Sequence, residues 1–298
     1  MTASSRLRRP RLVDGVALIV FCGVLLAEAA WVRRAKSVTV DETFYLSCAL
    51  QSVHDGRLDP RLAADGVAPV PVMLAYLPPL ALGSEGQDRP DPWKGALQDP
   101  EWIVGPRLLN TLLCGVPLVA AVFVWLYRRR GIAGAVFGGG MVALSPTIVA
   151  HASLATTDVC FALATVLATA ALVWYLQSPN SRRLVVLAVA VAAAMAAKYS
   201  GLFLLLVVAA SVFLFQPMAR EPAAIASKRS FKTMVRTLAL FACLVGPIWW
   251  GLHLFSFSGP LKGLPIEATP DDSRWVKLLG RGQQATWFMQ TSKSNRWR

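Results

Sequence analysis

Apolar blocks long enough to cross a membrane constrain this chain more than any other feature. The clearest of about seven such blocks begins at Leu12 and ends at Trp31. A helix of about 20 apolar residues crosses the ~30 Å of hydrocarbon in a bilayer. We therefore predict an all-α fold, a polytopic bundle of about seven transmembrane helices. The other blocks lie at about 106–127, 131–149, 159–176, 184–197, 201–215 and 238–255.

Composition supports a membrane protein and argues against a nucleic-acid-binding one. The chain is 55% hydrophobic and 16% charged, whereas a soluble domain carries about 25% charged residues. Its net charge of +13 is spread over the loops between apolar blocks, where anionic lipid headgroups explain it. We predict one membrane module over residues 1–255, with a long first loop at 32–105. We expect the tail, 256–298, to be a cut-short segment.

Basic residues in the short loops predict the orientation of the bundle. The N-terminus, Arg128–Arg130, the turn ending at Arg183 and the stretch 220–236 are rich in Arg and Lys. Such loops face the cytoplasm. Alternation of the blocks then places the first loop, the turn before Asp158 and the tail on the extracytoplasmic side.

The first loop contains segments that we expect to fold. The stretch "ETFYLSCALQSV" has an apolar stripe at helical spacing, and "PVPVMLAYLPPLAL" is apolar and proline-rich. We predict that the first forms a helix and that the second packs on the bundle or along the membrane interface. The sequence "HDGRLDPRLAADG" between them is typical of turns.

Two adjacent acids, Asp41 and Glu42, lie near the start of this loop, and their pattern has two interpretations. The stretch "TVDE" fits a capping box, with Thr39 as N-cap and Glu42 reaching back to it. That reading accounts for Glu42 but leaves Asp41 free to accept a proton or orient a hydroxyl. We treat both acids as candidate catalytic residues and favour Asp41. Asp158 is a third candidate, with an N-cap as its alternative role.

Several cations and polar residues join these acids on the predicted extracytoplasmic side. Lys198 stands between two short apolar blocks that could also be one broken element, and Arg107 opens the second block. Both could hold a phosphate, since arginine offers a fork of donors and lysine a point charge. His151 and Tyr45 complete the set of candidates. The sequence contains no metal-ligand spacing.

Four stretches in this order are similar to one enzyme family. The stretches are "DETFY", "RLLN", "LSPTIVAHASLATTD" and "AAKYSGLFLLL". With them the sequence resembles the protein O-mannosyltransferase-like glycosyltransferases of the GT-C superfamily over about residues 12–215. The resemblance implies a GT-C-like fold in a bacterial-type inner membrane. It also implies transfer of a sugar, such as mannose, from a polyprenyl-phosphate donor to a protein, lipid or glycan hydroxyl.

The resemblance also assigns roles to individual residues. Asp41 and Asp158 match the acids of the family, while Lys198 and Arg107 match basic positions that contact the carrier phosphate. Some relatives bind a divalent metal. A His-Pro-Pro-Leu or Lys-Pro-Pro-Leu element of the family lacks its basic residue here, whether it is aligned with "APVPVML" or with "LPPL". Together with the short length, this leaves an alternative function, a non-catalytic membrane protein that binds polyprenyl lipids or is a truncated pseudoenzyme.

Overall fold

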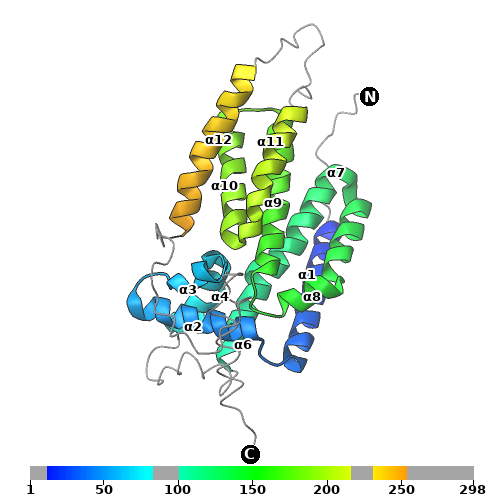
Figure 1. Cartoon of the computed structure of the whole chain (residues 1–298). Coiled ribbons are helices and arrows are strands. Elements are labelled where there is room, and N and C mark those ends of the chain that lie inside the picture. Colours follow the sequence, from blue (N-terminus) through cyan, green and yellow to red (C-terminus); the bar gives the residue numbers. More distant parts are fainter. Residues whose placement is uncertain (1–11, 83–100, 216–230, 254–298) are drawn as a thin grey trace, which may run out of the picture.

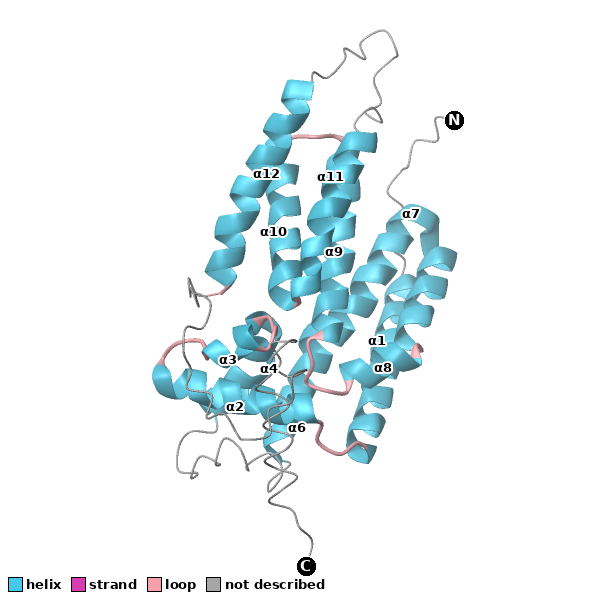
Figure 2. Cartoon of the chain, viewed as in Figure 1, coloured by secondary structure: helices cyan, strands magenta, loops and turns pink. Residues whose placement is uncertain are grey.

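The computed structural model describes residues 12–82, 101–215 and 231–253 of the chain. These residues form helices joined by short loops and contain no strand (Figure 2). The predicted all-α fold is therefore confirmed for the described part of the chain. The predicted tail and the basic stretch 220–236 lie outside the described residues, apart from 231–236.

The second and third predicted blocks form a helical hairpin beside the first. Helix α1 covers Leu12–Ala35, while α6 (Glu101–Asn110), the π-helical turn η1 (Thr111–Gly115) and α7 (Val116–Ala143) follow one another without a gap. Within α7, Gly131 has φ 74° and ψ −166°. A Cβ atom on Gly138 would overlap the Leu126 side chain, although a straight helix would separate these residues by about 18 Å. The run therefore folds back on itself at Gly131.

The third block ends earlier than predicted, because a new helix begins at Pro146. Helix α8 covers Pro146–Ala152, and Ser145 caps it by accepting a hydrogen bond from the Ile148 N–H. Proline at the first helical position and serine before it are typical helix-start signals. A five-residue turn then leads into α9, which covers Asp158–Gln177.

The remaining helices pack around α10 to form the second half of the bundle. The elements are α10 (Ser181–Ala197), the 3₁₀ turn η2 (Tyr199–Leu202), α11 (Phe203–Phe215) and α12 (Phe231–Leu252). A Cβ atom on Gly201 would lie 2.6 Å from the Ala194 carbonyl oxygen, so glycine is needed where the chain turns. The two short blocks are thus separate helices. Buried side chains of α9, α10 and α12 form their common core, among them Leu172, Leu187, Val191 and Val245.

The first loop forms a helical layer across one end of the bundle (Figure 1). Helix α2 covers Val40–Asp55 and α4 covers Pro69–Leu82, so both predicted apolar segments are helical. Their buried residues, such as Leu46 and Tyr76, share a core with Ala155 of the turn before α9. The prediction of turns alone between α2 and α4 is wrong, because Asp59 caps a short helix, α3 (Pro60–Ala64).

Four helical stretches in the described residues are long and apolar enough to cross a membrane. They are Asp14–Ala35, Trp102–Ala143, Asp158–Gln177 and Val235–Leu252. The second stretch contains the hairpin and therefore two of the predicted blocks, while α10 and α11 are shorter than 18 residues. The described part of each predicted block is largely helical, and four stretches meet the length and hydropathy expected of a span.

Chain direction separates the basic turns from the candidate site. Helix α9 runs away from Asp158, and α10 begins at Ser181 and returns to Lys198. Arg182 and Arg183 therefore lie at the end of the bundle opposite Asp158 and Lys198. The turn at Gly131, next to Arg128–Arg130, lies at that same far end (Figure 1).

Candidate active site

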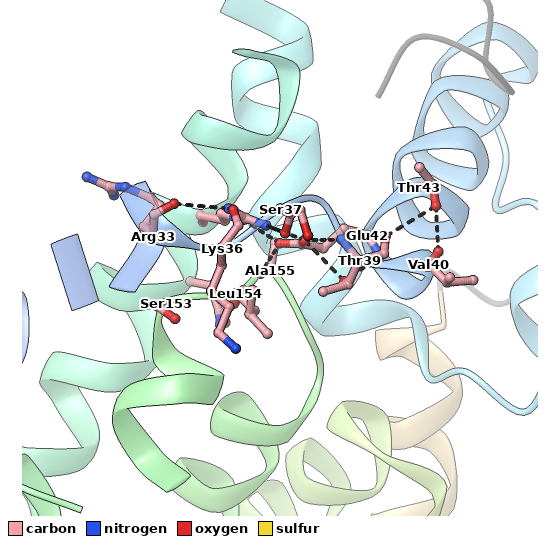
Figure 3. Close-up of polar contacts among 12 residues, drawn as sticks. Arg33, Lys36, Ser37, Thr39, Val40, Glu42, Thr43, Ser153, Leu154 and Ala155 are labelled. Atoms are coloured by element: carbon pink, nitrogen blue, oxygen red, sulfur yellow. Dashed lines mark hydrogen bonds and ion pairs between the residues drawn. The ribbon is translucent and has the colours of Figure 1, made fainter. Parts of the chain in front are cut away.

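A buried ion pair joins the first loop to the bundle, and Figure 3 shows Glu42 with the residues around it, among them Thr39 and Ala155. The Glu42 side chain is fully buried, and its two carboxylate oxygens accept from Arg107 Nε and Nη2, both at 2.7 Å. Glu42 also accepts from the backbone N–H groups of Thr39 and Ala155, each at 3.0 Å. Burial raises the pKa of Glu42, but the bonds from Arg107, Ala155 and Thr39 outweigh it and hold the pKa below its usual value.

The capping box predicted for Glu42 is confirmed and is part of this larger network. The Glu42 N–H donates to Thr39 Oγ1 at 3.4 Å, and the Glu42 carboxylate returns to the Thr39 N–H. Arg107 reaches further back along the chain and donates to the carbonyl oxygens of Lys36 and Ser37 at 3.1 and 2.8 Å. One arginine thus fixes both the start of α2 and the linker before it.

Two residues one turn beyond Arg107 hold the segment that leads to α9. Asn110 donates to the carbonyl oxygens of His151 and Leu154 at 3.2 and 2.6 Å. Thr111 donates to the carbonyl oxygen of Ala152 at 2.6 Å. Spacings of three and four residues place these side chains on the same face of a helix as Arg107. The "RLLN" stretch therefore attaches the first loop and the turn before α9 to one helix.

A second ion pair, at the start of α9, is more exposed to solvent. Asp158 Oδ1 is 2.7 Å from Lys198 Nζ, and the two side chains are 39% and 43% exposed. His151 Nδ1 lies 3.4 Å from Asp158 Oδ2. Asp158 is the first residue of α9, and Thr157 occupies the N-cap position. The alternative N-cap role for Asp158 is therefore wrong.

Asp41 is electrostatically coupled to this open pair. Partial burial is the largest cause that raises the pKa of Asp41, and the negative charge of Asp158 raises it further, while Lys198 lowers it. The pKa of Tyr45 is also raised, mainly by burial and then by the charges of Asp41 and Asp158. Besides Glu42 and Arg107, the structure therefore brings five predicted residues, Asp41, Asp158, Lys198, His151 and Tyr45, to one end of the bundle.

Arg107 and Glu42 differ from the other candidates because their polar groups are already occupied. Arg107 is 5% exposed and bonds to Glu42 and to three backbone carbonyl oxygens, those of Arg33, Lys36 and Ser37. A phosphate could reach its guanidinium only after these bonds were broken. We therefore assign Arg107 and Glu42 to positioning the site, in place of the predicted phosphate contact and catalytic role.

The residues near Asp41 do not fit a metal ion. No group of three or more His, Cys, Asp or Glu side chains in the described residues is arranged to hold one. His151 and Asp158 are two such groups, but the third neighbour of Asp158 is the ammonium of Lys198. A bound cation next to an ammonium is electrostatically unfavourable, so we derive no step through a metal.

The part of the chain from residue 105 to residue 250, which supplies the bundle residues of the candidate site, matches a known family. Residues 105–250, just under half of the 298-residue chain, match the model of the dolichyl-phosphate-mannose-protein mannosyltransferases. This stretch is similar to that family. It contains Arg107, Asp158 and Lys198, whereas Asp41 and Glu42 precede it. No curated protein and no solved structure matches the chain.

Sequence reasoning missed three residues that shape the candidate site. Tyr76 of α4 is fully buried, and its hydroxyl lies 3.3 Å from the carbonyl oxygen of Ala155 and 3.4 Å from that of Glu42. A single tyrosine in the middle of an apolar helix was the available signal. Asn110 could have been found as the polar residue one turn after Arg107. Nothing in the sequence singled out Ala155, which acts through its backbone.

Proposed function

We propose that the chain transfers a sugar, with mannose the first to test, from a polyprenyl-phosphate donor to an acceptor hydroxyl. The family match supports a membrane glycosyltransferase. The observation that carries the proposal is the accessible Asp158–Lys198 ion pair, to which Asp41 is electrostatically coupled: burial, and then the charge of Asp158, raises the pKa of Asp41. A carboxylate with raised proton affinity next to an accessible cation suits attack by a hydroxyl on a sugar phosphate.

Asp41 acts as the base in this mechanism. The acceptor oxygen forms a bond to the anomeric carbon, the bond from that carbon to the phosphate oxygen breaks, and the hydroxyl proton passes to Asp41. The products are the glycosylated acceptor and polyprenyl phosphate. Among the described residues, no hydrogen bond or ion pair ties the Asp41 carboxylate to another side chain, so it is free to receive the proton.

Lys198 offsets the charge that develops on the leaving phosphate. Its ammonium has three N–H donors, and one of them is directed at Asp158. Because the Lys198 side chain is 43% exposed, the other two can reach a phosphate oxygen. Asp158 keeps the ammonium in place, and its own negative charge increases the proton affinity of Asp41.

The arrangement of charges supports a site on the extracytoplasmic face. Arg128–Arg130, Arg182 and Arg183 lie at the opposite end of the bundle from Asp158 and Lys198. Short loops rich in arginine stay in the cytoplasm. We therefore propose an integral membrane protein of the bacterial inner-membrane type, with the N-terminus in the cytoplasm and Asp41 on the other side.

The test is transfer of labelled mannose from mannosyl polyprenyl phosphate by the purified chain. We expect Asp41→Asn to reduce turnover about 10²–10⁴-fold, the range for loss of a general base. Asp65→Asn is the matched control, because Asp65 belongs to the same loop but its charged neighbours are Arg61 and Asp59. Equal turnover by wild type and Asp41→Asn would contradict the mechanism.

The alternative function, a non-catalytic protein that binds polyprenyl lipids, gives a different result in the same assay. Both stretches aligned with the family's basic motif, "APVPVML" and "LPPL", lie almost entirely within α4 and supply no basic residue. Donor that binds to wild type and to Asp41→Asn equally well, without turnover by either, would favour this alternative.

A further inference from the structure

A groove with one aromatic wall takes no part in the mechanism above. Its volume is about 760 Å³, within the ~300–1,000 Å³ of small-molecule pockets. One wall comes from α3 and the turn before it, and the other includes Tyr199, Trp249, Trp250 and His253. Tyr199, one of the lining residues, directly follows Lys198 in the chain.

Two ring nitrogens at this wall form a donor and an acceptor. His253 Nδ1 lies 2.9 Å from the Trp249 carbonyl oxygen, which can only accept, so Nδ1 carries the hydrogen. In the neutral ring, His253 Nε2 is then an acceptor, whereas Trp249 Nε1–H is always a donor. Both atoms are buried and have no hydrogen-bond partner among the described residues. A ligand that both donates and accepts would satisfy them.

The rings around these nitrogens provide flat apolar faces. The Trp249 and His253 centroids are 4.7 Å apart at 60°, and the Tyr199 and His253 rings are stacked at 6.1 Å and 16°. An aromatic face is electrostatically negative and attracts the weakly positive C–H groups on one face of a pyranose ring. The same pyranose carries hydroxyl groups, each of which is both a donor and an acceptor.

We propose that this groove binds a pyranose ring of the acceptor, so that the acceptor is a saccharide or carries one. The proposal rests on the proposed sugar transfer and names its acceptor class. A phosphate offers acceptor oxygens but no donor for His253 Nε2, and an aliphatic tail offers neither. A hydroxyl next to an aromatic face satisfies both nitrogens.

Saturation-transfer NMR tests the proposal, with the full chain in lipid nanodiscs and methyl α-mannopyranoside as the probe. We expect transfer to the ring protons of the probe, and Trp249→Phe and His253→Phe should each weaken binding about tenfold, as expected for a lost hydrogen bond. Trp174→Phe is the matched control, because Trp174 lies near Arg183 at the opposite end of the bundle. Unchanged thermal unfolding would show that each variant is folded.

Three outcomes would overturn the proposal: no saturation transfer to wild type, equal binding by wild type and Trp249→Phe, or competitive displacement of the probe by polyprenyl phosphate. The last would assign the groove to the carrier lipid. Hydrolysis of mannosyl polyprenyl phosphate without acceptor separates this inference from the proposed function. If hydrolysis depends on Asp41 but no saccharide binds, the proposed sugar transfer is still supported. The groove would then not be the binding site for the acceptor.

Discussion

Two ion pairs at the same end of the bundle have equal lengths and opposite surroundings. Glu42–Arg107 and Asp158–Lys198 both close at 2.7 Å, but the side chains of the first are 0% and 5% exposed and those of the second 39% and 43%. A buried pair is costly to break because it leaves an unpaired charge without water. An exposed pair contributes little to stability and can exchange partners. The first pair therefore positions the site, and the second is available for chemistry.

Breaking the buried pair should have the largest effect on stability. We expect Arg107→Gln to lower the free energy of unfolding by about 3–5 kcal/mol, because Glu42 would keep a buried, unpaired carboxylate. Thermal and denaturant unfolding in detergent would measure the loss. A stability equal to that of Lys198→Gln would show that the two pairs do not differ as proposed.

Removing the Asn110 amide should have the next largest effect. Asn110→Ala leaves the partly buried carbonyl oxygens of His151 and Leu154 without this donor, which should cost about 1–3 kcal/mol. The same unfolding measurement applies. Thr169→Val, on the exposed surface of α9, should stay within about 0.5 kcal/mol of wild type. An Asn110→Ala protein as stable as this control would argue against the role given to "RLLN".

Breaking the open pair should change stability least but activity strongly. Lys198→Gln should alter the free energy of unfolding by less than about 1 kcal/mol. Mannose transfer should fall about 10²–10³-fold, the usual effect of losing an electrostatic contact to the transition state. Measuring both quantities on one preparation separates the roles. A large loss of stability with unchanged turnover per folded molecule would reverse our assignment.

The smallest effect that we predict is a shift in pH dependence. Because the pKa of Asp41 is raised, activity should be lost as pH falls through a midpoint above the usual aspartate range. Asp158→Asn removes a negative neighbour and leaves Lys198 unpaired. Both changes lower the pKa of Asp41, so the midpoint of residual donor hydrolysis should move to lower pH. A midpoint that stays in place or rises would show that Asp158 does not act on Asp41.

The sequence predicted the elements of this protein better than the contacts between them. Length and hydropathy located the helices, and the spacing of Thr39 and Glu42 predicted their capping box, because these signals are local. The sequence analysis assigned Arg107 to phosphate binding and missed its ion pair with Glu42. Glu42 is 65 residues away in the chain, and no local sequence pattern connects the two residues. Helix α3 was read as turns because its cap and Pro60 lie in a stretch rich in Gly, Asp and Pro.

The sequence predicted which candidate residues lie on the same side of the membrane. It did not predict the contacts and exposure of these residues. Counting spans placed Asp41, Asp158 and Lys198 on one side, since alternation of helices depends only on their number. The exposure that separates this group from Glu42 and Arg107 depends on tertiary packing. Trp249 and His253 were not singled out, because one helical turn of aromatic residues near a span end also fits a membrane interface.

Cross-linking across the proposed site tests the central claim most directly. In a chain whose five native cysteines are replaced by alanine, Asp41→Cys can be paired with Asp158→Cys or, as control, with Arg183→Cys. We predict that a short bifunctional thiol reagent links 41 to 158 and does not link 41 to 183. No link between 41 and 158, or an equally efficient link between 41 and 183, would contradict the account.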